Sequence, residues 1–488
     1  MDAITRRTFL QGTVAGLAGG AMMPGAWTAT SDEPRFNVVL LMSDEHNPKF
    51  TSLHGHPLLE TPNLERLAAR GVLFENGYCP SPLCMPSRSA FMSGRRVHDI
   101  QCYNNCNAIP QEFPAYGALL AEQGVHATHV GKSDVYRPSP ELGFSELIHH
   151  LDRQWPGDMN ISRDPLTIRD DGKQRAQGYG PREDAWAGDK FYAEAALDWL
   201  RERDPASDQP FTLCANIIAP HFPHFNTPDI WEQYADGADL PQYGTEQPSA
   251  NHPYARDLRR HFTTDVFTEQ YIRGLRRGYL GNVHFVDDVI GQFLDTLDET
   301  GLAENTVFIY TSDHGEMLGK FGMWWKCSLY EDSVRVPVLA MGPGFEQGKR
   351  IATPVDLHDV QASLFAATKS ERPKNWAGTP LQSLQHEMPD RVLFSEYHGH
   401  GVRASGYMIR KGDWKLIWCA EAPHLLFNLA EDPEELDNLA DKAPDKLGEL
   451  EADLYGICDP VQENERAAAF IQRQLAAGKA AQINGETG

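Results

Sequence analysis

The chain lacks several features that would each point to a particular class of protein. No apolar run reaches the roughly 18 residues that a membrane-spanning helix needs, so we expect no membrane span. Basic residues are scarce, because 44 Lys and Arg stand against 68 Asp and Glu, for a net charge of −24. Since phosphate contacts depend on Lys and Arg, this charge argues against nucleic acid as a partner, although it does not exclude a local basic pocket. No internal repeat is visible.

Cysteine is also sparse. Eight cysteines in 488 residues are too few for a disulfide scaffold. No Cys-x-x-Cys pair occurs, which argues against a zinc ribbon. In an oxidising compartment some of the eight could still pair, and Cys102 and Cys106 are close enough in sequence for a disulfide. The spacing alone does not decide whether this disulfide forms.

The first thirty residues resemble an export signal. Arg6 and Arg7 precede the apolar pair Phe9-Leu10, and a weakly hydrophobic stretch rich in Gly and Ala follows from residue 12 to 23. Small residues come next, near positions 26–29. This pattern is typical of a twin-arginine signal peptide, which we place at residues 1–29. It predicts a bacterial protein that is exported already folded and is periplasmic or secreted.

The following 300 residues alternate between strand and helix patterns. Hydrophobic residues make up 41% and charged residues 23% of the chain, as in soluble globular proteins. Continuous apolar runs predict buried strands, and long amphipathic stretches predict helices between them. The strands fall at residues 37–42, 126–130, 211–218 and 306–311, and the helices at 62–70, 185–203 and 268–299. The alternation predicts an α/β domain over residues 35–380, with a large, mostly parallel sheet sandwiched by helices.

The sequence changes character near residue 380. Short strand-like runs separated by turn residues occur at 391–396, 406–410, 414–418 and 425–429. They predict a smaller antiparallel sheet, followed by a C-terminal helix and a helical tail beyond Gln462. We therefore expect an α+β subdomain over residues 381–488. The polar segment 156–182 is expected to be a long surface loop near the site.

Two of the predicted strands end in groups of potential metal ligands. Asp44 and Glu45 follow the first strand, and Asp313 and His314 follow the strand at 306–311. Ligands of open α/β sheets bind outside the carboxyl ends of the strands. Three of the four side chains are carboxylates, which favours a hard divalent cation, Ca²⁺ or Mg²⁺, over zinc.

A cysteine lies close to an arginine in the segment Cys84-Met85-Pro86-Ser87-Arg88. A nearby guanidinium lowers the pKa of a thiol and favours the nucleophilic thiolate. The alternative is a buried structural cysteine at the start of a helix.

The segment 84–88 resembles the Cys-x-Pro-Ser-Arg hallmark of the type I sulfatases of the alkaline phosphatase superfamily. The likeness covers roughly residues 36–440 and includes several further motifs. These motifs are Gly124–Lys132, Pro220–Pro223, Asp313–Glu316, the Lys-x-x-x-Tyr-Glu pattern at Lys326–Glu331, Met408–Lys415 and Asp432–Glu435. The resemblance implies an alkaline phosphatase-like fold and hydrolysis of a sulfate monoester, either a small-molecule or a carbohydrate ester.

The resemblance also implies the nucleophile and the cation site. In the family, a maturation enzyme oxidises the cysteine to formylglycine, and its hydrated diol is the nucleophile. The modified Cys84 would hold the cation, preferably Ca²⁺, together with Asp44, Asp313 and His314. Glu45 stands where many members have a further ligating Asp.

The remaining family positions imply contacts with the sulfate ester. Arg88 would hold the diol, and Lys132 and Lys326 would bind sulfate oxygens. His221 would protonate the leaving oxygen, with His224 as a nearby alternative. Asn105 aligns with an Asn that contacts the sulfate in choline-sulfatase-like members.

One departure from the family pattern bears on the substrate. Many family members have the sequence Gly-Lys-Trp-His here, and Asp134 replaces its His. The Asp at this position is similar to the pattern of the arylsulfatase K branch, which acts on glucuronate 2-sulfate. The segment 395–399 is similar both to that branch and to choline sulfatases. A choline site needs aromatic faces, and a uronate site needs a cation. The candidates are Trp155, Trp324 and Trp325 for choline and Arg137, Lys320 and His400 for a uronate.

Two other functions stay open at this point. The same nucleophile and cation could serve a phosphonate monoester or phosphodiester hydrolase. A chain whose Cys84 is never converted could instead be a non-catalytic binder of sulfated glycans.

Overall fold

A nine-stranded sheet lies at the centre of the computed structural model, which describes residues 34–106, 112–135, 139–151, 157–235 and 239–484. The strands are β1 (Asn37–Asp44), β2 (Gly71–Tyr78), β3 (His126–Lys132), β4 (Glu146–Leu151), β6 (Phe211–Pro220), β8 (Thr306–Ser312), β9 (Arg335–Met341), β10 (Lys349–Ile351) and β11 (Val355–Asp356). Their order is β10-β2-β9-β8-β1-β6-β3-β4, and β11 also pairs with β2. Neighbours from β8 to β4 run parallel, and only β9 is antiparallel to its partners β8 and β2. The predicted mostly parallel sheet is confirmed.

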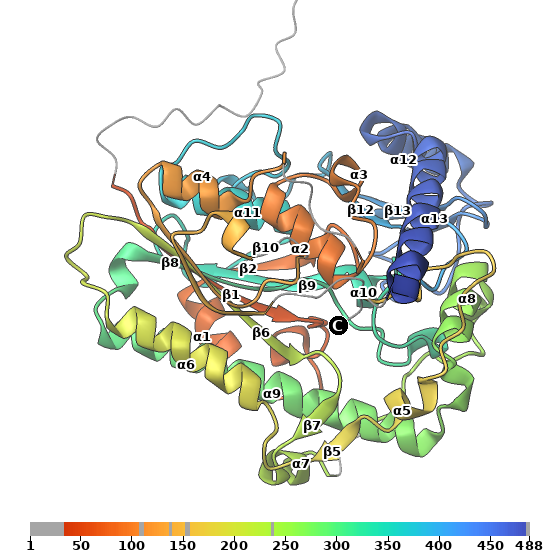
Figure 1. Cartoon of the computed structure of the whole chain (residues 1–488), viewed down its shortest axis with the longest axis horizontal. Helices are drawn as coiled ribbons and strands as arrows, with labels where there is room; N and C mark the ends of the chain where they lie inside the picture. The colour runs from red at the N-terminus through yellow and green to blue at the C-terminus, as the bar shows by residue number, and fades with distance from the viewer. Residues whose placement is uncertain (1–33, 107–111, 136–138, 152–156, 236–238, 485–488) are drawn as a thin grey trace, which may run out of the picture. The chain divides into compact units, whose positions relative to one another are not determined.

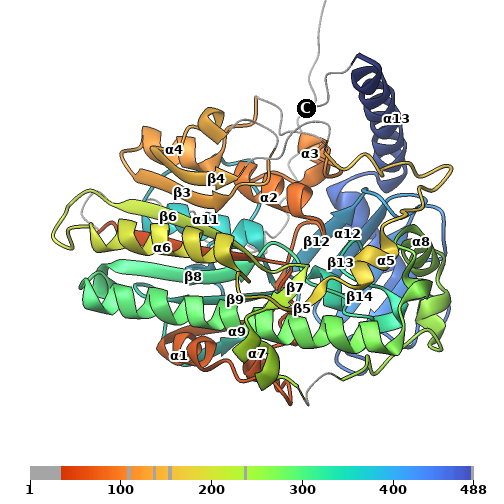
Figure 2. The same ribbon diagram turned by 60° about the horizontal axis from the view of Figure 1, so that its bottom comes forward.

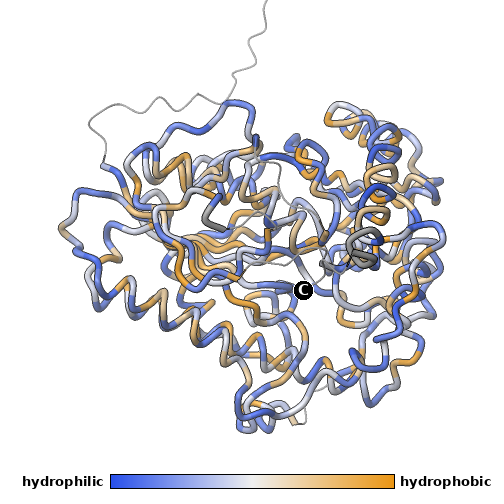
Figure 3. Tube along the Cα trace, in the orientation of Figure 1, coloured by the Kyte–Doolittle hydropathy of each residue, from blue (hydrophilic) through white to orange (hydrophobic). Residues whose placement is uncertain are grey.

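Helices cover both faces of this sheet, because alternate residues of a strand point to opposite sides. Val38 and Leu40 of β1 belong to one core cluster, and Val39 and Leu41 to another. The first cluster includes residues of α2 (Cys84–Ser93), α4 (Tyr116–Glu122) and α11 (Leu357–Ala367), and the second includes residues of α1 (Pro62–Arg70), α6 (Ala187–Arg201) and α9 (Glu269–Glu299). Figure 1 shows the two helical layers on either side of the strands. Figure 3 shows hydrophobic residues gathered along the central strands.

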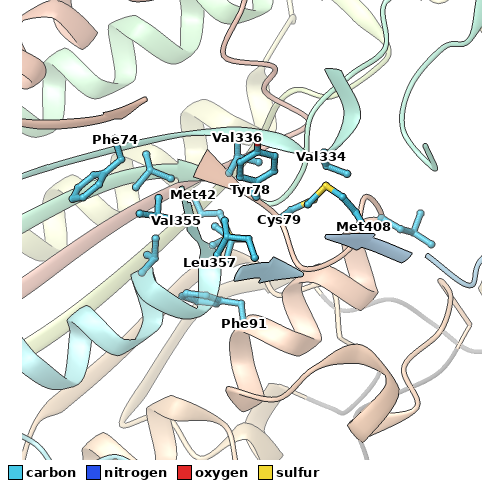
Figure 4. Packing of buried hydrophobic residues seen from close by; sticks show 14 of the residues in the cluster. Met42, Phe74, Tyr78, Cys79, Phe91, Val334, Val336, Val355, Leu357 and Met408 are labelled. Carbon is cyan, nitrogen blue, oxygen red and sulfur yellow. The ribbon is translucent and has the colours of Figure 1, made fainter. Parts of the chain in front are cut away.

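The C-terminal region forms a separate four-stranded antiparallel sheet, as expected. Its strands are β12 (Val392–Tyr397), β13 (Gly406–Lys411), β14 (Trp414–Cys419) and β15 (Leu425–Asn428). Tyr407 and Leu416 share a core cluster with Leu450 of α12 (Pro444–Ile457), so one face packs on this helix. Met408 belongs instead to the main core cluster together with Cys79 (Figure 4), and residues 35–488 form one compact unit. The structure does not test the predicted domain boundary at residue 380, which stays a prediction.

The end of the chain agrees with the expectation. Two helices follow the small sheet, because the chain turns at Cys458-Asp459 and Pro460 begins α13 (Pro460–Asn484). Pro at the first turn of a helix is tolerated, since its missing N–H would have no helical partner there. The helical tail beyond Gln462 is confirmed as far as Asn484.

The prediction of a long loop over residues 156–182 is wrong only where the segment forms two short elements. It contains α5 (Gly172–Ala176) and β5 (Tyr179–Pro181), and β5 pairs with β7 (His224–Asn226). The polar composition of the segment does not indicate these elements, because β7, the partner strand of β5, is distant in the chain. Figure 2 shows α9 running from beneath the sheet toward this region, where it contacts α5, β5 and β7.

The remaining elements are short connections. They are α3 (Val97–Ile100), α7 (Pro228–Gln233), α8 (Pro253–His261), α10 (Glu331–Val334) and 3₁₀ turns at Ser52–His54, Ser139–Leu142, Pro248–Asn251, Thr264–Val266, Ala303–Asn305, Lys320–Gly322 and Leu381–Ser383. Among the described residues, no helix has the length and apolarity that crossing a membrane requires. The predicted signal peptide, residues 1–29, lies outside the described residues.

All eight cysteines are described, and none forms a disulfide. The Cys102 thiol hydrogen-bonds to the Ser89 hydroxyl at 3.2 Å, and the Cys106 thiol donates to the Asp158 carbonyl at 2.6 Å. The disulfide considered between Cys102 and Cys106 is therefore not formed, because the two sulfur atoms have different partners.

Candidate active site

Four neighbouring strands deliver the predicted residues to one edge of the sheet. The strands β8, β1, β6 and β3 are adjacent and parallel, so their carboxyl ends meet. The residues at these ends are Asp313 and His314 after β8, Asp44 and Glu45 at the end of β1, His221 after β6, and Lys132 as the last residue of β3. This agrees with the position at which open α/β sheets bind ligands.

Cys84 is the first residue of α2 and is completely buried against this edge. Its Sγ lies 3.3 Å from His314 Nε2 and 3.9 Å from Asp44 Oδ1, and Lys326 Nζ donates to it at 3.0 Å. Burial and Asp44 raise the pKa of the thiol, but Lys132, Lys326 and His314 together lower it to about 6. The site therefore favours the thiolate at neutral pH.

Arg88 lies one helical turn beyond Cys84 and fixes two of the carboxylates. Its Nε donates to Asp313 Oδ2 at 2.7 Å, and its Nη2 lies 3.7 Å from Asp44 Oδ2. Its Nη1 donates to Asn216 Oδ1 at 2.9 Å. Asn216 could not be predicted from the sequence, since a lone Asn within an apolar strand carries no motif.

Lys132 is surrounded by acids. Its Nζ donates to Asp44 Oδ2 and lies 3.4 Å from Asp134 Oδ2. Burial lowers the pKa of Lys132, but Asp134 and Asp44 raise it above its ordinary value, so the ammonium stays charged. Asp134, the departure from the family pattern, is thus a direct neighbour of a candidate sulfate ligand.

Glu45 is buried and has an unusual environment. Its backbone φ is +68°, and its N–H donates to Asp313 Oδ1 at 3.2 Å. Neither carboxylate oxygen takes part in a hydrogen bond with the described residues. The nearest cations are His221 Nε2 at 3.3 Å and Lys326 Nζ at 3.6 Å. Burial raises the pKa of Glu45 to about 8 although both of these groups lower it.

His221 faces the same carboxylate from the carboxyl end of the neighbouring strand β6. Its Nδ1 lies 2.6 Å from the Phe222 carbonyl and donates to it, so Nε2 is the atom that faces the site. Burial, together with the positive charges of Lys326 and Lys132, lowers the pKa of His221 to about 4, although Glu45 and Asp44 raise it. His224, the alternative, instead donates to the Leu275 carbonyl of α9 at 3.0 Å and lies away from the site.

Asn105 and Lys326 complete the predicted set. Asn105 Oδ1 accepts the backbone N–H of Met85 at 3.2 Å, so it supports the first turn of α2 next to Cys84. Both side chains are buried, at 5% and 6% exposure.

Most candidates for recognising the rest of a substrate have other roles. Trp324 and Trp325 are core residues at 2% and 1% exposure. Lys320 is held by Asp332 at 2.7 Å and by Glu434 at 2.8 Å. His400 is buried against Cys327, 3.6 Å from its sulfur. Trp155 and Arg137 lie outside the described residues.

The donor set fits a divalent cation. Asp44, Cys84, Asp313 and His314 each offer one ligand atom, and these atoms lie within 4.8 Å of one another. Asp44, Glu45 and His221 form a second, overlapping group. The two oxygens of Glu45 form no hydrogen bond with the described residues, although Oε2 lies 3.3 Å from His221 Nε2, and a buried carboxylate normally has hydrogen-bond partners. Carboxylate oxygens are the ligands that Ca²⁺ and Mg²⁺ prefer.

Comparison with known proteins decides the family. The model of the sulfatase family matches residues 36–370. The chain belongs to the sulfatase family. A second model, for the C-terminal region of N-sulphoglucosamine sulphohydrolase, matches residues 319–455 of this sulfatase.

Curated relatives of this sulfatase cover nearly the whole chain. Arylsulfatase K of Xenopus laevis is 28% identical, over 93% of this chain and 88% of its own length. Choline-sulfatase of Rhizobium meliloti (strain 1021) is 31% identical, over 83% of this chain and 82% of its own. The family and these relatives make the chain a sulfuric ester hydrolase.

Solved structures share the fold. The phosphonate monoester hydrolase of Silicibacter pomeroyi has a TM-score of 0.70 at 23% identity, covering 86% of this chain and 94% of its own. A protein in complex with its substrate D-glucosamine-2-N,6-O-disulfate has a TM-score of 0.67 at 19% identity, covering 91% of this chain and 98% of its own. At these identities the likeness supports the fold alone.

Proposed function

We propose that this sulfatase hydrolyses a sulfate monoester with Cys84 converted to formylglycine and with a divalent cation, Ca²⁺ or Mg²⁺, at Asp44, Asp313 and His314. The observation that carries the proposal is the position of Cys84. It stands at the buried start of α2, within 3.0 to 3.9 Å of a lysine, a histidine and an aspartate. Formylglycine, once hydrated, supplies two hydroxyls on one carbon, one to attack sulfur and one to release the sulfate.

The charges of the site support a cation. The carboxylates of Asp44, Asp134 and Asp313 lie against Arg88 and Lys132 and offset their positive charge. Little excess positive charge is therefore left there for an anionic ester. A bound divalent cation would supply this excess and polarise the sulfate oxygens.

The chain's own residues would then divide the work. Lys132 and Lys326 would donate to sulfate oxygens on either side of residue 84. Arg88 would hold Asp313 and residue 84 in place. His221 presents Nε2 to the site beside the position of the leaving oxygen. Because the pKa of His221 is lowered, Nε2 would first take up a proton and then pass it to that oxygen.

A phosphonate monoester hydrolase is the second candidate, because phosphonate monoester hydrolases share the fold at a TM-score of 0.70. The experiment compares kcat/KM for phenyl sulfate and for phenyl phenylphosphonate, using protein matured in a bacterium that converts such cysteines. We expect a preference for the sulfate of at least about tenfold, with both rates lost in Cys84→Ala. A preference for the phosphonate would reassign the enzyme, and no turnover of any sulfate ester would favour the non-catalytic glycan binder.

We propose further that residues 1–29 direct export of the folded enzyme by the twin-arginine route. A double substitution, Arg6→Lys with Arg7→Lys, should retain the enzyme in the cytoplasm on fractionation of a bacterial host, while the unchanged chain reaches the periplasm. Equal export of both would contradict this proposal.

A further inference from the structure

Three aromatic rings next to the active site enclose a cation that belongs to the chain itself. The guanidinium carbon of Arg175 lies 4.8 Å from the ring centroid of Phe222, 5.1 Å from that of Trp325 and 5.9 Å from that of Phe262. Phe222 and Trp325 in turn pack at 5.3 Å between centroids. Aromatic faces arranged in this way attract organic cations such as quaternary ammonium groups. Here Arg175 already occupies them.

The aromatic group adjoins the site directly. Phe222 follows His221, whose imidazole stacks on its ring at 4.2 Å. Lys326 Nζ lies 5.8 Å from the same Phe222 centroid and donates to Cys84 Sγ. Since Arg175 and Lys326 both lie close to this one ring, their charged groups are no more than about 11 Å apart. A sulfated monosaccharide can therefore span the distance from residue 84 to Arg175.

One side-chain hydrogen bond orients Arg175 and leaves other donors of its guanidinium available. Its Nε donates to Asp171 Oδ2 at 2.8 Å, while Nη1 and Nη2 make no hydrogen bond with any residue that the structure describes. Asp171 is shared, because Arg169 also donates to both of its oxygens at 3.1 Å. The guanidinium thus keeps a free edge that could donate two parallel hydrogen bonds to a carboxylate or a sulfate.

Arg175 is also accessible to solvent. Arg175 is 18% exposed and His221 is 16% exposed, whereas Cys84, Asp44 and Asp313 are at or near zero. Arg175 and His221 are therefore both in contact with solvent beside the buried charges.

We propose that Arg175 determines specificity for sulfate esters whose alcohol carries a second negative charge, a carboxylate or a second sulfate, and that it excludes cationic alcohols such as choline. This inference rests on the proposed sulfatase function. The two sources of negative charge share one chemistry, and the substrates below separate them.

The test compares matched esters on the full, matured chain. The 2-, 3- and 4-sulfates of methyl glucuronoside differ from those of methyl glucoside by the carboxylate, and the 2,6-disulfate of methyl glucoside adds a second sulfate. Phenyl sulfate is the neutral reference, and choline sulfate is the cationic one. We expect kcat/KM for a carboxylate-bearing or disulfated ester to exceed that of its neutral partner by at least about tenfold, the value of one charge-assisted hydrogen bond.

Substitution of Arg175 should remove that preference and open the aromatic faces. In Arg175→Met, kcat/KM for a carboxylate-bearing or disulfated ester should lie within about threefold of that for its neutral partner. Turnover of choline sulfate should rise, while phenyl sulfate is hydrolysed as before. Arg175→Lys keeps the charge without the fork and should keep part of the preference. Arg182→Met is the matched control, since Arg182 also lies over a ring, that of Phe225, with an aspartate partner, but is half exposed at the surface.

Each outcome decides the proposal. A wild-type enzyme without the preference, or a preference that survives Arg175→Met, would overturn it. Phenyl sulfate reports separately on the chemistry, because its hydrolysis by the wild type and by Arg175→Met shows an intact fold and catalytic site. Failure of the wild type on every sulfate ester would overturn the proposed function itself.

Discussion

Two of the buried clusters of charge in this sulfatase differ in how completely their atoms are paired. The first joins the small sheet to the main body. Lys415 Nζ donates to Glu331 at 2.8 Å and to Glu435 at 2.7 Å. The other oxygen of Glu331 accepts from Tyr78 at 2.9 Å, and that of Glu435 accepts the backbone N–H of Glu331 at 2.8 Å. Every carboxylate oxygen there has a donor.

The second cluster is the active site, where Glu45 has no hydrogen bond to either oxygen. Buried polar groups are normally paired, so the two oxygens of Glu45 leave hydrogen-bonding capacity for a ligand. Glu331 and Glu435 belong to sequence motifs shared with sulfatases, yet their contacts here are structural. Membership of a motif therefore does not distinguish the two kinds of residue, and the unpaired oxygens of Glu45 set the active-site cluster apart.

The sharpest way to separate the clusters is to remove the central group of the catalytic one. Cys84→Ala should lower kcat/KM on phenyl sulfate by at least roughly 10³-fold, because the nucleophile is gone. The free energy of unfolding should change by less than about 2 kcal/mol, since only the small group beyond Cβ of residue 84 is deleted. Activity assays and urea titration measure the two effects. An active Cys84→Ala enzyme would contradict the catalytic role of the cluster around Cys84.

The opposite pattern is expected for the paired cluster. Lys415→Met leaves two buried carboxylates without their cation and should cost about 3 to 5 kcal/mol of stability. The protein that remains folded should keep the wild-type kcat. Urea titration gives the first value, and an assay corrected for the folded fraction gives the second. The control is Lys442→Met, which removes an exposed pair with Asp437 and should change little.

How much of this could be predicted from the sequence differs between the clusters. The positions of Asp44, Asp313 and His221 follow from strand ends, because adjacent parallel strands bring their carboxyl ends together. The structural role of Glu435 does not follow, since its partner Glu331 lies 104 residues earlier in the chain.

Partners in space also account for the specific errors. Lys320 resembles a free cation in the sequence but is bound by Asp332, and Trp325 faces Arg175 instead of a choline group. Arg175 itself carries no motif and was missed. Its significance comes from three rings contributed by distant segments, which no local pattern shows.

Cation binding also distinguishes the two clusters. Protein freed of metal by a chelator should gain stability when Ca²⁺ is added, by about 2.7 kcal/mol at a concentration 100 times the dissociation constant. Thermal unfolding with and without Ca²⁺ measures the gain. Asp313→Asn should abolish it, whereas Lys415→Met should retain it. An equal gain in Asp313→Asn would place the cation elsewhere.

The smallest expected effect is the pH dependence of the paired cluster. Burial alone would raise the pKa of Glu331, but Lys415, Arg410 and Arg335 lower it from 4.5 to about 2. A lowered folded-state pKa stabilises the protein above pH 4.5, and this stabilisation is lost as the pH falls toward 2. The pKa of Glu435 is raised, chiefly by burial, so it offsets part of this loss. The stability difference between wild type and Lys415→Met should therefore narrow between pH 7 and pH 3 in urea titrations. A constant difference would contradict the assignment.

The central claim is that Cys84 is matured into the nucleophile, and mass spectrometry of the tryptic peptide that carries it tests this most directly. The peptide should come from protein made in a host that converts such cysteines. Conversion of the thiol to an aldehyde removes about 18 Da, and we predict this loss in most of the protein. A peptide that retains the free thiol in active, natively matured enzyme would contradict the formylglycine mechanism.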